Sequence, residues 1–249
     1  MRIVKMLVLL LVVSLLFSTS TFAKSGNAKE SLVSLGDSIP YGYNLTKNDN
    51  ASTSKYAFPY LIGDDGDVRV RNLSEPGWKT EQMLSSLQSD QKFRQAVRHA
   101  DYITLNIGNN DLLQALEVAQ FKSGGDPVKF VDFLQEEITD SNLFGNIGEI
   151  IIETRTLTDA PIVIYNVYNP FQLDDPLHLI GSQVLPGINT QFTTIATYFN
   201  AQYGDVVLAD AYLAFGQEQA KYVIPGDIHP TIEGQIKLAE IGLDALNLY

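Results

Sequence analysis

The 249-residue sequence contains no cysteine and only three histidines. Without cysteine there can be no disulfide bond, thiolate zinc site, iron–sulfur cluster or cysteine nucleophile. Basic residues are also scarce, since 17 lysines and arginines stand against 29 aspartates and glutamates, for a formal net charge of −12. An acidic chain of this kind repels polyphosphates and anionic lipid surfaces, so nucleic acid is not an expected partner. We expect a small molecule or a neutral polymer instead.

The first 23 residues have the order of a secretory signal peptide. Arg2 and Lys5 form a short positive region, and residues 6–17 are apolar except for one serine. Thr21 and Ala23 place small residues at the −3 and −1 positions of a cleavage site. The apolar run is shorter than the roughly 20 residues that a membrane-spanning helix needs. We therefore expect cleavage near Ala23, secretion without a stable membrane anchor, and a single domain over residues 24–249.

Short apolar runs alternate with longer stretches of helical character in the rest of the chain. The expected strands are residues 31–35, 68–73, 102–107, 162–167 and 206–209. The expected helices are residues 82–100, 128–138, 143–157, 183–202 and 232–248. Near-continuous apolar strands separated by helices predict a parallel sheet that is covered on both faces. The predicted fold class is α/β, a three-layer α/β/α sandwich with five parallel strands and its functional groups at their carboxyl ends.

Polar motifs follow the first three expected strands. Ser38 lies in a Gly-Asp-Ser turn after the first strand, which is a suitable position for a nucleophile. Gly77 follows the second strand, and Asn110 follows the third in a Gly-Asn-Asn-Asp run. A glycine N–H and an asparagine amide can both stabilise an oxyanion. Taken singly, each motif is also good turn or helix-cap chemistry.

A histidine with a nearby carboxylate precedes the last expected helix. His229 is followed by a proline, and Asp227 lies two residues before it. This arrangement is what general-base activation of a serine requires. Of the other two histidines, His99 stands in a polar helical stretch and is expected at the surface. His178 falls in an expected loop and is a candidate for the substrate cleft.

Together, the order and spacing of these four segments resemble those of the SGNH hydrolases, also called the GDSL esterase/lipase family. The family's serine, glycine, asparagine and histidine match Ser38, Gly77, Asn110 and His229, and the resemblance spans roughly residues 31–249. It implies a flavodoxin-like fold, Ser38 as nucleophile, His229 as base, and an oxyanion hole made of Ser38, Gly77 and Asn110. It implies no metal and no organic cofactor.

One position departs from the family pattern. Many members carry the triad acid three residues before the histidine, where this chain has Gly226, whereas Asp227 is only two residues before His229. Either Asp227 reaches the imidazole from a slightly altered loop, or a backbone carbonyl near Gly226 orients the ring. We favour the carboxylate.

The resemblance leaves several substrates open, because family members hydrolyse lipids, lysophospholipids, thioesters, short esters and acetylated sugars. Candidate substrate-binding residues, chosen because they follow the strand ends or lie in the loop after the fourth strand, are Tyr41, Trp78, Leu112 and His178. Residues 168–187 are a candidate lid. We expect a secreted, monomeric carboxylic ester hydrolase acting on a small-molecule, lipid or acylated-sugar ester. The alternatives are a carbohydrate O-deacetylase, a lysophospholipase or thioesterase, and, in another class, an inactive secreted carbohydrate-binding module.

Overall fold

The computed structural model describes residues 28–45 and 50–249, so the expected signal peptide lies outside the described residues. The described chain forms an all-parallel five-stranded sheet in the order β2-β1-β3-β4-β5. The strands are β1 (Ser31–Gly36), β2 (Arg69–Asn72), β3 (Tyr102–Asn106), β4 (Ile162–Tyr165) and β5 (Val206–Ala209). All five expected strands are present. This order is that of flavodoxin-like sheets, in which ligands bind where the strand order reverses, between β1 and β3.

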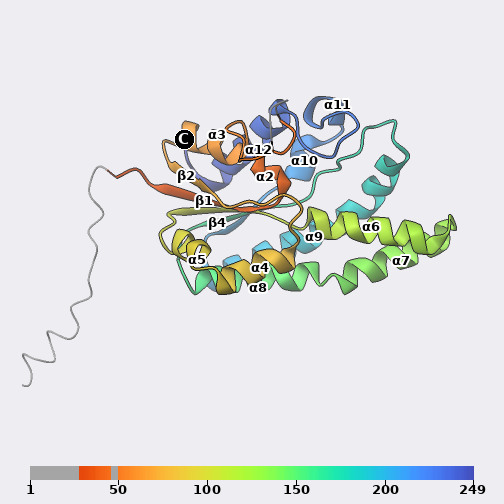
Figure 1. Cartoon of the computed structure of the whole chain (residues 1–249), viewed down its shortest axis with the longest axis horizontal. Coiled ribbons are helices and arrows are strands. Elements are labelled where there is room, and N and C mark those ends of the chain that lie inside the picture. Colours follow the sequence, from red (N-terminus) through yellow and green to blue (C-terminus); the bar gives the residue numbers. More distant parts are fainter. Residues whose placement is uncertain (1–27, 46–49) are drawn as a thin grey trace, which may run out of the picture.

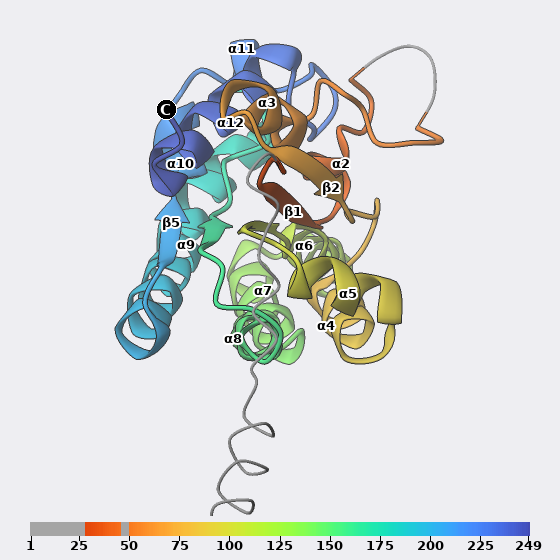
Figure 2. The ribbon, with the colours of Figure 1, turned by 90° about the vertical axis from the view of Figure 1, so that its left-hand side faces the viewer.

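Helices cover both faces of the sheet (Figure 1; Figure 2). One face carries α4 (Thr80–Ser89), α5 (Gln91–Arg98), α8 (Leu143–Arg155) and α9 (Pro176–Tyr203). The other carries α3 (Phe58–Asp65), α10 (Ala211–Phe215), α11 (Gln219–Tyr222) and α12 (Ile232–Leu246). Side chains of β4 alternate between the two cores, with Ile162 and Ile164 on the first side and Val163 and Tyr165 on the second. The predicted α/β/α sandwich is confirmed.

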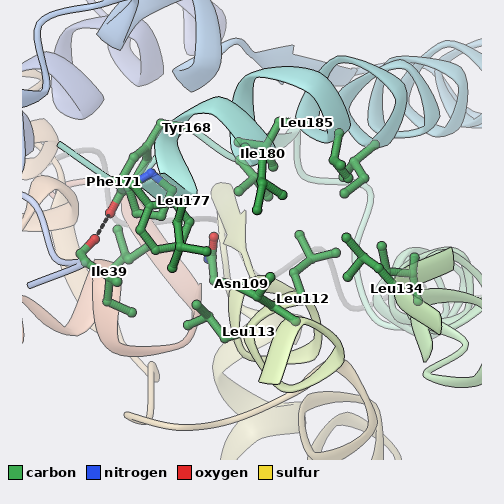
Figure 3. Close-up of a pocket in the computed structure, with 18 residues that line it drawn as sticks. Ile39, Asn109, Leu112, Leu113, Leu134, Tyr168, Phe171, Leu177, Ile180 and Leu185 are labelled. Atoms are coloured by element: carbon green, nitrogen blue, oxygen red, sulfur yellow. Dashed lines mark hydrogen bonds between the residues drawn. The ribbon is translucent and has the colours of Figure 1, made fainter. Parts of the chain in front are cut away.

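A helical hairpin extends beyond the carboxyl ends of the strands (Figure 1). It consists of α6 (Asn109–Ser123) and α7 (Pro127–Asp140), which pack through a small apolar cluster of Ala115, Ala119 and Leu134. The second helix was expected over residues 128–138, whereas α6 was not among the expected helices. The first half of α9 lies beside this hairpin (Figure 3).

Two expected helix boundaries were wrong. The expected helix 82–100 is broken at Asp90, whose side chain accepts hydrogen bonds from the backbone N–H groups of Lys92 and Phe93 and so begins α5 as a separate helix. The helix expected to begin at residue 183 begins at Pro176, where Asp175 caps it and the proline occupies the first turn. The second half of the candidate lid, residues 168–187, is therefore helix.

Within the described residues, no helix combines the length and apolar character that crossing a membrane would demand.

Candidate active site

Ser38 stands where β1 leaves the sheet. The backbone N–H of Asp37 donates to Asn106 O at 3.2 Å, and a Cβ on Gly36 would lie only 2.3 Å from that same oxygen, so glycine is required at this crossing. Asp37 then caps the short helix α2 (Ser38–Tyr41) by accepting a hydrogen bond from the Ile39 N–H at 3.0 Å. The result is a Ser38 side chain held at the carboxyl end of β1.

His229 reaches Ser38 from the opposite end of the chain. Its loop is closed by a hydrogen bond from Ile224 N to His229 O at 2.9 Å. The ring lies with Nε2 at 2.9 Å from Ser38 Oγ and Nδ1 at 2.6 Å from Asp227 Oδ1. Because a carboxylate can only accept, Nδ1 carries the hydrogen and Nε2 is free to accept the serine proton. The group in contact with Nδ1 is thus the Asp227 carboxylate, and not a backbone carbonyl near Gly226.

A further residue, Asn44, supports Asp227 from the other side. Its Nδ2 donates to Asp227 Oδ2 at 2.7 Å, and Asn44 is itself held by a pair of hydrogen bonds with Asn50. Burial opposes ionisation of Asp227, but the hydrogen bonds from Asn44 and His229 and the nearby His229 ring outweigh it and hold the pKa of Asp227 below its usual value. Tyr43 packs against the imidazole of His229, with the two ring centres 5.1 Å apart. The contact of Asn44 with Asp227 was not predicted from the sequence.

Gly77 and Asn110 follow β2 and β3, the two neighbours of β1, so they lie at the same edge of the sheet as Ser38. Residues 75–78 form a tight turn in which Trp78 N donates to Glu75 O at 3.2 Å and Gly77 has φ +80°, the pattern of a type II turn. Nδ2 of Asn110 donates to Trp78 O at 2.8 Å, which fixes the amide next to Gly77 and leaves its second hydrogen available. In the described part of the chain, no acceptor is found for the N–H of Ser38 or of Gly77.

Buried carboxylates lock these segments together. Asp111 accepts from Thr80 N at 3.0 Å and Thr80 Oγ1 at 2.7 Å, which ties the start of α4 to the start of α6. Asp37 accepts from Asn109 Nδ2 at 2.9 Å. Burial, only partly offset by hydrogen bonds from Ile39 and Asn109, raises the pKa of Asp37 to about 6. Over residues 28–45 and 50–249, no three histidines or carboxylates gather in a way that could hold a metal ion.

An apolar cavity opens beside these residues (Figure 3). Of the four candidate substrate-binding residues, Leu112 lines it. Tyr41 is buried with its hydroxyl on Asn50 O, and Trp78 stacks on Phe93. His178 lies in the first turn of α9 and not in a loop as expected, and its ring Nδ1 forms a hydrogen bond with Phe171 O in the preceding segment. Tyr41, Trp78 and His178 are not among the residues that line the cavity, because their side chains contact other parts of the protein.

Comparisons with known proteins agree with this arrangement. Residues 34–236 match the model of the GDSL-like lipase/acylhydrolase family. The chain is 23% identical over 208 residues to the spore germination lipase LipC of Bacillus licheniformis, covering 83% of this chain and 91% of that protein. It is 30% identical over 105 residues to the uncharacterized protein YpmR of Bacillus subtilis, a match that spans 42% of this chain and only 38% of that protein.

Among solved structures, the lipase Lip_vut3 from a goat rumen metagenome has the same fold. The TM-score is 0.67 at 20% sequence identity, and the match covers 87% of this chain and 97% of that one. The family model extends over more than half of the sequence and includes all four motif segments. The chain therefore belongs to the GDSL-like lipase/acylhydrolase family of ester hydrolases.

Proposed function

We propose that this chain is a serine hydrolase that cleaves carboxylic esters through an acyl-enzyme on Ser38. The observation that carries the proposal is the continuous contact from Ser38 Oγ to His229 Nε2 at 2.9 Å and from His229 Nδ1 to Asp227 Oδ1 at 2.6 Å. A serine hydroxyl is a weak nucleophile at neutral pH and needs an adjacent base. This geometry supplies the base and the group that orients it.

The proposed reaction has two halves. Ser38 Oγ attacks the ester carbonyl carbon while its proton passes to His229 Nε2, and the tetrahedral intermediate then expels the alcohol, which takes that proton. Water attacks the resulting acyl-Ser38 ester by the same route and releases the carboxylic acid. Asp227 holds the ring in the required tautomer and stabilises the positive charge that His229 gains in each half.

Three donors would stabilise the negative oxygen of the intermediate. They are the backbone N–H groups of Ser38 and Gly77 and the second hydrogen of the Asn110 amide. Removing one such donor typically lowers the rate by about 10²–10³. Because the described protein offers no other acceptor to the two backbone groups, both can point at an incoming carbonyl oxygen.

We also propose that the enzyme is exported and acts on acyl esters of lipid character. The positive and apolar segments of residues 1–23 support export. The apolar lining of the cavity beside Ser38 supports a hydrocarbon acyl group, and the relative LipC is named a spore germination lipase. Amino-terminal sequencing of the protein recovered from culture medium tests export, with a start immediately after Ala23 as the expected result.

Hydrolysis of p-nitrophenyl butyrate by wild type, Ser38→Ala and Ser34→Ala tests the activity. Ser34 is a suitable control because it lies on β1, four residues before Ser38, is fully buried, and has a hydroxyl without a partner in the described residues. We expect Ser38→Ala to lose activity by at least about 10³ and Ser34→Ala to retain it. Equal rates from wild type and Ser38→Ala would refute the proposal and favour the binding-module alternative.

A further inference from the structure

The cavity lies next to the segments that carry Ser38, Asn110 and His229. Ile39, Ile228 and Asn109 line its inner end, and each is the immediate neighbour in sequence of Ser38, His229 or Asn110. The hydroxyl of Tyr168 donates to Ile228 O at 2.7 Å and holds this end together (Figure 3). A group covalently attached to Ser38 would therefore have the cavity directly next to it.

The lining of the cavity suits a hydrocarbon and nothing polar. None of its 18 residues is charged, and Asn109 and Tyr168 are the two with polar side-chain atoms, both already hydrogen-bonded to the protein. A sugar or glycerol unit in this space would lose its hydrogen bonds to water without replacement, which is costly. A methylene chain gains from the same transfer.

The cavity runs between two helices for a definite length. Leu112 and Leu113 of α6 face Leu177 and Ile180 of α9 across it (Figure 3). The lining also includes Leu116 of α6 and Ile188 of α9. The lining extends over residues 109–116 of α6 and residues 177–188 of α9. At a rise of about 1.5 Å per residue, these stretches are about 10 Å and about 16 Å long, which matches the length of an extended acyl chain of roughly eight to twelve carbons.

Four side chains close the far end. Leu134 and Ile138 of α7 and Val184 and Ile188 of α9 line this cavity and, at the same time, a second hollow. The second hollow has a mixed lining that includes polar residues which the first does not touch, among them Gln135, Gln183 and Gln191. Leu134 and Ile188 are nearly inaccessible to solvent, so they form a filled partition between the two spaces.

We propose that this cavity binds the acyl chain of a medium-chain ester, of eight to twelve carbons, and that the partition of Leu134, Ile138, Val184 and Ile188 sets the upper limit of chain length. The proposal rests on the ester hydrolase function proposed above. Each methylene that enters the cavity raises kcat/KM by up to about fourfold. Carbons that would extend beyond the partition add nothing to kcat/KM. A longer chain must either leave those carbons outside the cavity or displace a buried side chain of the partition.

A series of p-nitrophenyl esters from two to sixteen carbons, each below its aggregation threshold, tests the proposal. Wild type is expected to show its highest kcat/KM at eight to twelve carbons and a value at least tenfold lower at sixteen. Val184→Ala thins the partition and is expected to raise the ratio of the sixteen-carbon to the eight-carbon value at least tenfold. Val131→Ala is the matched control, because Val131 lines only the second hollow and is largely exposed. Its profile should match that of wild type.

Two further measurements separate the proposal from the catalytic function on which it rests. Leu116→Phe adds bulk at the last position of α6 that lines the cavity and is expected to lower the ratio of the ten-carbon to the four-carbon value at least tenfold. Binding of methyl decanoate to Ser38→Ala, followed by calorimetry, needs no turnover and should be lost when Leu116→Phe is added. A flat profile in an active enzyme, or an unchanged profile in Val184→Ala, overturns the proposal alone. Binding of methyl decanoate without turnover of any ester by wild type overturns the ester hydrolase function instead.

Discussion

Replacing Asp227 by asparagine separates the charge of the triad acid from its geometry. The Oδ1 atom of Asp227 accepts from His229 Nδ1 at 2.6 Å and from Ile228 N at 2.6 Å, whereas Oδ2 accepts from Asn44 Nδ2 at 2.7 Å. An asparagine that places its amide oxygen at the Oδ1 position keeps the ring tautomer and orientation. Asp227→Asn then removes the negative charge opposite the positive charge that His229 acquires during catalysis, together with the Oδ2 acceptor of the hydrogen bond from Asn44.

The size of this effect follows from Coulomb's law. Two unit charges about 4 Å apart attract by about 4 kcal/mol at an effective dielectric constant of 20. The Asp227 side chain is 20% exposed, so solvent weakens the attraction somewhat. We therefore expect kcat/KM of Asp227→Asn to fall by about 10²–10³. Asp227→Ala also removes the acceptor that orients the ring and should lose about 10⁴.

The assay is kcat/KM for p-nitrophenyl octanoate at pH 8, with thermal unfolding as a check on folding. Asp64→Asn is the matched control, because it makes the same change of charge at an exposed position on α3. This control should behave as wild type. An Asp227→Asn enzyme within fivefold of wild type would refute the reasoning and show that a backbone carbonyl is sufficient to orient His229.

Three more changes test other parts of the site. Asn110→Ala removes one oxyanion donor, so kcat should fall by about 10²–10³ with a much smaller change in KM; a loss below fivefold would contradict that role. Asn44→Ala removes the hydrogen bond to Asp227 Oδ2, and we expect kcat to fall about tenfold while KM is unchanged; a rise in KM alone would count against a positioning role. Because burial raises the pKa of Asp37 from 3.8 to about 6, its neutral form favours the folded state. That contribution is complete below about pH 3.8 and is lost as the pH rises to about 6. Urea unfolding should accordingly show wild type losing about 1 kcal/mol relative to Asp37→Asn between pH 5 and pH 7, and a constant difference would contradict the raised pKa.

The strands and the four motif segments were predictable because their signals are local. The buried run of β4 is apolar, and that of β1 is apolar apart from Ser34. Ser38 and His229 lie in short segments whose chemistry is visible in sequence. The register of the parallel sheet then brings those segments together, because the carboxyl ends of neighbouring strands lie at one edge. Gly36 of β1, for example, pairs with Asn106 of β3.

Long-range contacts were not predictable in the same way. Asn44 bonds to a residue 183 positions away, and no pattern near it announces that partner. Trp78 follows Gly77 and was a natural choice for a substrate contact, but its ring stacks on Phe93 at 5.7 Å. Leu134 lies on an expected helix, yet its position at the far end of the cavity depends on how α7 folds back on α6. The cavity therefore emerges from tertiary packing and has no sequence motif of its own.

Covalent labelling with a fluorophosphonate tests the central claim most directly, because such a reagent reacts with a serine only when a base and an oxyanion hole activate it. We expect mass spectrometry of the digested wild-type protein to show one adduct, on Ser38, and the rate of labelling to fall by at least about 10² in His229→Gln. Wild-type protein that carries no adduct on Ser38, or carries it on another serine, would contradict the account.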